Sequence, residues 1–212
     1  MDCCTQRGLN RIFTPGTAQR EIRRFRKKGL EGGDKLLAQA IARQGVQGAH
    51  VLEVGGGIGG IQIELLRAGA AHAVDVDISQ AYVAGARELA QSLGLGGITE
   101  HRVLDFAQAA DQVEPADVVV LNHVVCCYPD MPALVRPAAG HARKLLALTF
   151  PREVWWMHAG RRVMNFAMWL LRWEFRFFIH PHRAIIQLVG ERGLRPISDR
   201  LNGGWRIIIF ER

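Results

Sequence analysis

After residue 45 the chain alternates short β-rich runs with segments of helical periodicity, and a glycine-rich loop follows the first run. Strand-like runs occupy residues 50–54, 72–77, 98–104, 116–122 and 144–150. Such alternation predicts βαβ units around a parallel sheet. Further β-rich runs at 174–180 and 205–212 bring the expected total to seven strands. We therefore expect an α/β fold with a doubly wound, mostly parallel, Rossmann-like sheet.

The remaining segments predict how one domain is organised over residues 1–212. Residues 1–46 contain no strand-like run and read as a helical N-terminal cap, in which Thr17 and Asp34 are candidate helix caps. Residues 46–150 form the expected ligand-binding core. Residues 151–173 read as a helical insertion on the substrate side, and residues 174–212 as C-terminal strands and a helix.

The glycine loop VLEVGGGIGG, residues 51–60, fits two nucleotide-binding patterns at once. Gly55, Gly57 and Gly60 satisfy G-x-G-x-x-G, the dinucleotide fingerprint. Glu53, Gly55, Gly57 and Gly59 satisfy E-x-G-x-G-x-G, the pattern that cradles S-adenosylmethionine. In both cases a strand ends, the backbone turns, and the N–H groups of the next helix face the ligand. One ligand predicts hydride transfer and the other methyl transfer.

Three acidic residues favour S-adenosylmethionine. Glu53 stands inside the strand end, where dinucleotide folds usually carry an apolar residue, and its carboxylate suits an ammonium group. Asp77 ends the second strand and can accept hydrogen bonds from ribose hydroxyls, although dinucleotide enzymes place a carboxylate similarly, so Asp77 alone does not separate the two ligands. Asp105 follows the third strand and can accept from an adenine amino group; a helix cap is the alternative role. Asp75 alternates with Asp77, so we expect it to face away from the ligand, as a solvated strand-edge carboxylate.

Four segments, VLEVGGGIGG, AVDVDIS, RVLDF and ADVVVLNHV, resemble the successive motifs of the class I S-adenosylmethionine-dependent methyltransferases. The resemblance covers about residues 46–150 and extends to the closing strands, which in that fold usually form an antiparallel hairpin. It implies S-adenosylmethionine as the cofactor. The implied cofactor-binding residues are Glu53, Gly55, Gly57, Gly59, Asp77, Ile78, Asp105, Phe106 and Asn122. A nicotinamide enzyme is disfavoured because neither tyrosine, Tyr82 nor Tyr128, has a lysine four residues on.

The end of the fourth strand carries the candidate chemistry. Asn122 and His123 should face the sulfonium end of the cofactor, and His123 can act as a base for an oxygen or nitrogen nucleophile. A helix-start or core histidine is the alternative, since methyl transfer often needs only proximity and orientation. The residues NHVV differ from the N-P-P-Y pattern of enzymes that methylate nucleobase or glutamine amines.

The segment VVCCYPDMPALV, residues 124–135, resembles the same region of magnesium-protoporphyrin O-methyltransferases. That short likeness implies an apolar small or medium acceptor with a carboxylate or hydroxyl group. The predicted substrate-side residues are Tyr128, Trp155, Trp156, Arg162 and His180. A basic stripe beside a Trp-rich face at 151–173 suits a flat apolar acid or a membrane surface. A core-packing helix with a solvated face remains the alternative.

The formal net charge of +7 leaves further functions open. It fits nucleic acid, an anionic lipid surface, an acidic small substrate, or only a solvated arginine-rich surface. RNA methylation and a non-catalytic, S-adenosylmethionine-binding regulatory role therefore stay as alternatives. The absence of a leader-like or membrane-spanning apolar run predicts a cytoplasmic protein. The cysteine pairs Cys3-Cys4 and Cys126-Cys127 lack metal-binding C-x-x-C spacing, so we expect free thiols and no metal site.

Overall fold

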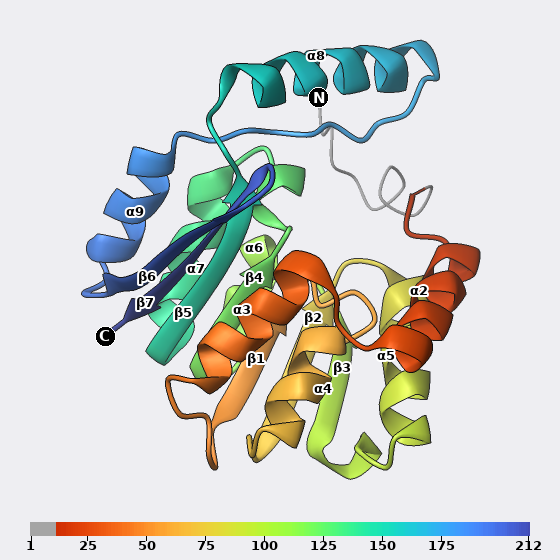
Figure 1. Cartoon of the computed structure of the whole chain (residues 1–212), viewed down its shortest axis with the longest axis vertical. Coiled ribbons are helices and arrows are strands. Elements are labelled where there is room, and N and C mark those ends of the chain that lie inside the picture. The colour runs from red at the N-terminus through yellow and green to blue at the C-terminus, as the bar shows by residue number, and fades with distance from the viewer. Residues whose placement is uncertain (1–11) are drawn as a thin grey trace.

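The computed structural model describes residues 12–212, and these residues form one seven-stranded sheet with helices on both faces (Figure 1). The order across the sheet is β3-β2-β1-β4-β5-β7-β6. Strands β1 to β5 are parallel, whereas β7 is antiparallel to both β5 and β6. The strands are β1 (His50–Val54), β2 (His72–Asp77), β3 (Thr99–Val103), β4 (Ala116–Asn122), β5 (Ala142–Pro151), β6 (Arg195–Asn202) and β7 (Trp205–Glu211). This topology confirms the predicted fold class and its closing antiparallel hairpin.

The two faces of the sheet bury separate apolar clusters, because successive side chains of a strand point to opposite faces. Val118 and Val120 of β4 pack toward α3 and α4, whereas Val119 and Leu121 pack toward α6, α7 and α9. The helices are α2 (Pro15–Lys28), α3 (Gly32–Ala42), α4 (Gly60–Arg67), α5 (Gln80–Ser92), α6 (Phe106–Ala109), α7 (Met131–His141), α8 (Trp155–Leu170) and α9 (His182–Gly190), with short 3₁₀ turns η1 (Gly96–Ile98), η2 (Ala110–Gln112) and η3 (Val125–Cys127).

The N-terminal helices α2 and α3 close over the core, as the sequence predicted. The two residues predicted to cap the starts of these helices, Thr17 and Asp34, are wrong. Helix α2 begins after Thr14, whose hydroxyl accepts a hydrogen bond from the backbone N–H of Thr17. Helix α3 begins after Glu31, so Asp34 lies in the first turn and is not the N-cap residue. Ile22 of α2 packs into a small apolar cluster with residues of α4 and α5. Helices α2 and α3 therefore belong to the folded core.

The predicted strand at 174–180 is wrong, and β6 takes its place in the sheet. The segment 173–181 has no strand partner; the N–H of Phe178 instead bonds the carbonyl of Cys126, 2.8 Å away, and the N–H of Phe177 bonds Asn165. Strand β6 is the outer edge of the sheet, and none of its residues is buried. An edge strand of this kind needs no apolar run, so its composition is polar.

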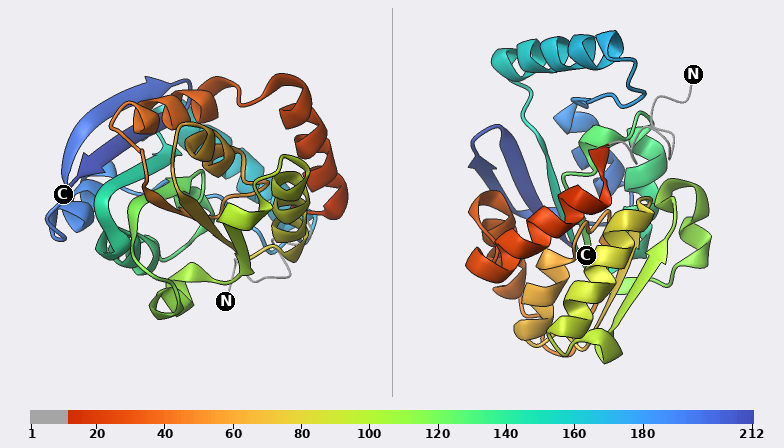
Figure 2. Two further views of the ribbon diagram at one scale, coloured as in Figure 1. Left: turned by 90° about the horizontal axis from the view of Figure 1, so that it is seen from below. Right: turned by 90° about the vertical axis from the view of Figure 1, so that its right-hand side faces the viewer.

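Helix α8 crosses above the carboxyl ends of the strands and stands away from the sheet, as two perpendicular views show (Figure 2). None of its residues is buried. The alternative of a core-packing insertion is therefore wrong. In the part of the chain that the structure describes, no helix is long and apolar enough to cross a bilayer.

Candidate functional site

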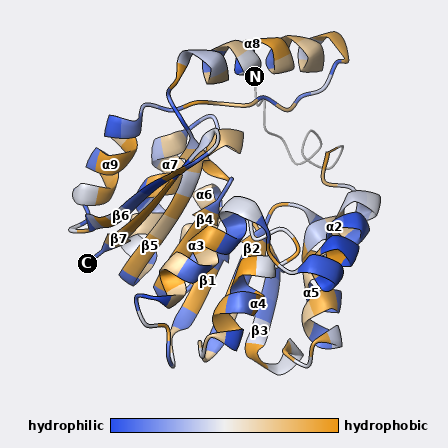
Figure 3. Ribbon diagram, in the orientation of Figure 1, coloured by the Kyte–Doolittle hydropathy of each residue, from blue (hydrophilic) through white to orange (hydrophobic). Residues whose placement is uncertain are grey.

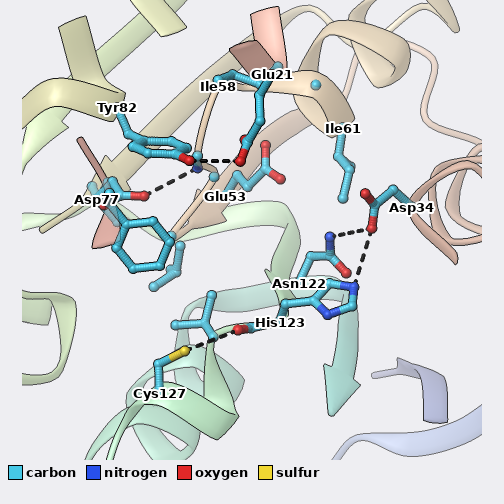
Figure 4. A pocket seen from close by; sticks show the side chains of 18 of the residues that line it. Glu21, Asp34, Glu53, Ile58, Ile61, Asp77, Tyr82, Asn122, His123 and Cys127 are labelled. Carbon is cyan, nitrogen blue, oxygen red and sulfur yellow. Dashed lines mark hydrogen bonds and ion pairs between the residues drawn. The ribbon is translucent and has the colours of Figure 1, made fainter. Parts of the chain in front are cut away.

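A cavity of about 510 Å³ opens at the carboxyl ends of the parallel strands. Its walls come from the segments that follow β1, β2, β3 and β4, and its rim from α2 and α3. Carboxyl ends of parallel strands meet at one edge, which is where doubly wound sheets bind ligands. Figure 4 shows the two ends of this cavity, with Asp77 and Glu53 on one side and His123 with Asp34 on the other.

The glycine loop after β1 presents bare backbone to the cavity. Gly55 adopts a left-handed conformation, with φ of 67°, and a Cβ there would lie 2.5 Å from a methyl group of Val124. A Cβ on Gly56 would lie 2.5 Å from the Asp75 carboxylate beneath the loop. Any side chain at either position would displace its neighbours or fill the cavity. The loop is thus built for close approach of a ligand to the backbone.

Asp77 lies at the end of β2 with part of its hydrogen-bonding capacity unused. Its Oδ1 accepts from the N–H of Ser79 at 2.7 Å, and its Oδ2 accepts from the N–H of Gly57 at 3.2 Å. A carboxylate has about four acceptor positions, so some remain for ligand hydroxyls. Burial, followed by the nearby charge of Asp75, raises the pKa of Asp77 to about 7. Ile78 follows on the cavity wall.

Two further carboxyl groups lie beneath the glycine loop. Glu53 lines the cavity, is almost fully buried, and accepts the N–H of Gln62 at 3.2 Å. Burial, then the charge of Asp75, raises the pKa of Glu53 well above its ordinary value. Asp75 is fully buried and accepts from the N–H of Gly56 and contacts His101, so the prediction of a solvated carboxylate is wrong. It is buried because β2 is an inner strand and the loop folds over its end.

Asp105 combines the two roles that the sequence left open. It is the N-cap of α6, since its Oδ1 accepts from the N–H of Ala107 at 3.1 Å. It also lines the cavity, where the hydroxyl of Tyr128 approaches its Oδ2 at 3.3 Å. Phe106, buried, lies beside it on the same wall. Tyr128 was predicted on the substrate side, and its hydroxyl instead contacts the carboxylate predicted for adenine.

The opposite end of the cavity holds a histidine–aspartate pair. His123, in a left-handed conformation with φ of 60°, places Nε2 3.3 Å from Oδ1 of Asp34 (Figure 4). Asn122 donates to the same oxygen at 2.9 Å, and the ring of Trp205 lies 4.0 Å from the imidazole. Burial alone would raise the pKa of Asp34, but the hydrogen bonds from His123 and Asn122 outweigh it and hold that pKa below its ordinary value.

Asp34 lines the cavity, although the sequence predicted only a helix cap at this position. Its position near the start of an apolar helix suggested a cap, which accounts for an aspartate there without any tertiary contact. Its actual partners, Asn122 and His123, lie at the end of β4 and directly after it, far along the chain. Glu21 and Tyr82 also line the cavity, although the sequence did not predict them there. The hydroxyl of Tyr82 in α5 donates a hydrogen bond to Glu21 in α2 at 2.7 Å.

Five predicted site residues lie away from the cavity wall as the described residues form it. Gly59 is the left-handed N-cap residue of α4, and its role is to start that helix. Trp155, Trp156 and Arg162 lie on exposed parts of α8. His180 bonds the carbonyl of Tyr128 through Nε2 at 2.9 Å, and burial lowers its pKa.

The two adjacent cysteines after β4 lie next to the histidine. The Sγ atoms of Cys126 and Cys127 are 3.7 Å apart, and both lie near the carbonyl oxygen of His123. Both thiols are free, and Cys127 lines the cavity. The pair Cys3-Cys4 falls outside the described residues.

Comparison with known proteins places this site in a family. Residues 19–199 match the family described as methyltransferase domain, so the chain belongs to that family. No curated protein matches it. Magnesium protoporphyrin IX methyltransferase from Synechocystis PCC 6803, solved with bound S-adenosylhomocysteine, is similar in structure at 24% identity and a TM-score of 0.69, over 84% of this chain and 80% of that one.

Two further structures share the fold at lower identity. An O-methyltransferase family protein from Burkholderia thailandensis has a TM-score of 0.70 at 18% identity, over 92% of this chain and 58% of that chain. An O-methyltransferase family 2 protein from Planctomyces limnophilus, in complex with apigenin, has a TM-score of 0.66 at 16% identity, over 93% of this chain and 61% of that chain.

The protein is an S-adenosylmethionine-dependent methyltransferase. The site agrees with that cofactor on its own geometry. The bare glycine loop leaves room against the backbone, and Asp77 keeps acceptor positions for hydroxyl groups. The Oδ1 atom of Asn122 is buried without a hydrogen-bond partner among the described residues, which suits a polar ligand beside it.

Proposed function

We propose that this enzyme methylates an oxygen or nitrogen atom of a small or medium, largely apolar acceptor. The observation that supports this most is the His123–Asp34 pair, at the end of the cavity away from Asp77. A hydroxyl or amine acceptor carries a proton that has to leave, and the imidazole of a neutral histidine can receive it. A carboxylate acceptor is already ionised and needs no base. A purely regulatory protein would have no use for such a pair.

The pair works through the two nitrogens of the imidazole. Asp34 stays ionised because its pKa is low, so it accepts a hydrogen bond from Nε2–H and holds the ring in one tautomer. Nδ1 then carries the lone pair that takes the proton of the acceptor. S-adenosylmethionine, when bound, supplies the electrophilic methyl group. Asn122 steadies the arrangement by donating to the same oxygen of Asp34.

Cofactor binding in this proposal follows the predicted residues. Asp77 accepts from the ribose hydroxyls, and Asp105 accepts from the adenine amino group while Ile78 and Phe106 pack on the ring. Glu53 attracts the ammonium group of the methionine moiety, and a cation placed against it would lower its raised pKa again. All five residues line the same cavity, which supports the assignment.

The apolar character of the acceptor rests on the remaining walls. Phe25, Leu30, Val124 and Leu134 line the cavity beside its polar groups. The similar structures include a magnesium protoporphyrin IX methyltransferase and a protein in complex with apigenin. Protoporphyrin IX and apigenin are both flat ring systems. An acceptor with a carboxylate or hydroxyl on an apolar framework fits these walls best.

Nucleic-acid methylation is the second candidate, and one observation favours it. Helix α2 exposes Arg20, Arg23, Arg26, Lys27 and Lys28 along its length. A basic helix near the cavity rim could contact phosphates, in which case binding would weaken steeply as salt rises. A cytoplasmic location also stays a prediction from the sequence.

An acceptor panel with isotopically labelled S-adenosylmethionine tests the proposal. The panel contains a porphyrin carboxylic acid, an apolar phenol, an aliphatic acid, an apolar amine and a short RNA. We expect label in one of the apolar small molecules; alkali then releases it from a methyl ester but not from an ether or amine. Label only in RNA would replace the proposal by the second candidate. Cofactor binding with no label in any acceptor would favour a regulatory role.

A further inference from the structure

Helix α8 turns its apolar side outward. The residues that face the body of the protein are partly buried: Met157, His158, Arg161, Met164, Asn165 and Met168. The large apolar side chains on the other side are between 61% and 81% exposed: Trp155, Val163, Phe166, Trp169 and Leu170. An exposed apolar surface of this extent marks a binding site for another molecule. We call these five residues the α8 docking surface.

The position of α8 is held by specific contacts, so the docking surface is presented in a defined orientation. Asn165 donates to the carbonyl of Phe177 at 2.9 Å and accepts from its N–H at 2.8 Å. Near its start, Trp156 and Met157 pack close to Gly204 in the turn between β6 and β7. Side chains on the body side thus fix the helix, and the outward side is left for a partner.

The charge around α8 indicates what kind of partner fits. The helix contains Arg161 and Arg162 and no aspartate or glutamate. Arg152 precedes it, and Glu153, the nearest acidic residue before it, accepts the N–H of His182 at 2.7 Å. Arginines beside exposed tryptophan and phenylalanine are typical of helices that lie in the interface of an anionic membrane. A second copy would bring the same cationic helix to the contact, which opposes self-association.

We propose that α8 docks the protein onto an anionic lipid surface, with the docking surface inserted among the acyl chains near the headgroups. Because β5 ends at Pro151 and α8 begins at Trp155, the helix lies at the edge of the sheet where the cavity opens. Figure 3 shows α8 above the ends of the strands. The docked protein then turns its cavity edge toward the lipid. A helix of 16 residues that lies flat satisfies this geometry without spanning the bilayer.

Vesicle binding tests the inference without cofactor or acceptor, so it is independent of methyl transfer. The full chain is sedimented with vesicles of phosphatidylcholine alone and with vesicles that also contain phosphatidylglycerol. Four of the five tryptophans lie within residues 155–173, so their fluorescence reports the same event. We expect binding to the anionic vesicles, with a blue shift of the emission, and much weaker binding to the neutral ones.

Two variants assign the binding to α8. Phe166→Gln with Leu170→Gln should abolish the blue shift, and Arg162→Gln should weaken anionic binding about fivefold, the contribution of one arginine near such a surface. The matched controls lie near the amino ends of the strands, away from α8: Ile98→Gln with Ile197→Gln, before β3 and near the start of β6, and Arg143→Gln at the start of β5. Both controls should bind like the wild type.

Three outcomes would overturn the inference. The wild type does not bind anionic vesicles; the α8 variants bind as well as the controls; or the protein forms dimers that the Phe166→Gln/Leu170→Gln variant loses, with no effect of lipid. The last outcome would assign the docking surface to a second copy. Binding of S-adenosylhomocysteine by each variant verifies that it is folded.

Discussion

Oδ1 of Asp34 lies 3.3 Å from Nε2 of His123, although one residue belongs to the N-terminal helical cap and the other follows β4. Asn122 donates to the same oxygen at 2.9 Å. The pair therefore joins α3 to the segment that follows β4 at one end of the cavity. His123 therefore has a charged side-chain partner at the cavity wall, unlike a histidine that only packs in the core.

Replacing His123 by alanine should lower kcat about 100-fold or more, the usual contribution of a general base. Affinity for S-adenosylhomocysteine should change by no more than about threefold, because the proton is moved only during transfer. The measurement is steady-state kinetics beside calorimetric binding. Asp34→Asn, which keeps a polar group near Asn122, should show a smaller loss in kcat and a changed pH profile. Unchanged kcat in His123→Ala would show that orientation alone is enough.

Replacing Gly56 by alanine should prevent cofactor binding. The new Cβ would lie 2.5 Å from the Asp75 carboxylate, which is buried and cannot move away. Overpacking of this kind destabilises by about 1–3 kcal/mol. The matched control is Gly97→Ala, whose Cβ would meet open space and whose φ is not left-handed. Thermal unfolding and binding titrations should separate the two; equal behaviour would contradict the tight packing under the loop.

Sequence reasoning found the parallel core because its signals are local. Apolar runs such as 116–122, the glycine loop and the acid at each strand end all lie within a few residues of the feature they predict. The segment 174–180 was misassigned because phenylalanine and isoleucine favour strands, whereas the true strand, β6, is a polar edge that has only one neighbour. An apolar run indicates that a segment is buried. It therefore predicts a buried strand, but an edge strand with a polar composition goes undetected.

The site residues divide in the same way. Glu53, Asp77 and Asp105 were predicted at the cavity because each lies at or just after the end of a strand, and strand ends meet at one edge of the sheet. Asp34, Glu21 and Tyr82 were missed because their positions depend on how α2 and α3 pack over the core, a long-range arrangement without a local pattern. Asp75 was misread because alternation along β2 gives its side, but not what covers that side.

The free energy of unfolding of the cofactor-free protein should fall as pH rises toward 8. Asp77 keeps its proton to about pH 7 in the folded state, against an ordinary value of 3.8. Between these values the unfolded chain binds fewer protons, so a rise in pH favours unfolding, and roughly 2–4 kcal/mol is lost across the window. Denaturant titrations from pH 5 upward measure it. Asp77→Ala should show a shallower slope; an identical slope would mean that Asp77 is ionised throughout.

Replacing Tyr82 by phenylalanine should weaken cofactor binding by loosening the cap. Its hydroxyl donates to Glu21 at 2.7 Å and joins α2 to α5 at the cavity rim. The loss should amount to about 1 kcal/mol, the usual net value of such a bond. Gln19→Ala is the control, because Gln19 bonds Glu88 of α5 at 2.9 Å on the exposed side. If both variants weaken cofactor binding equally, the general attachment of α2 to α5 determines the affinity, and the Tyr82–Glu21 contact at the cavity rim has no special role.

The central claim, that this cavity binds S-adenosylmethionine through Asp77, is tested most directly by calorimetry. S-adenosylhomocysteine and NADH are titrated separately into the wild type and into Asp77→Ala, with circular dichroism to verify folding. We predict that S-adenosylhomocysteine binds the wild type, binds the variant at least about tenfold more weakly, and that NADH binds neither. Equal binding of S-adenosylhomocysteine by both proteins, or binding of NADH alone, would contradict the account.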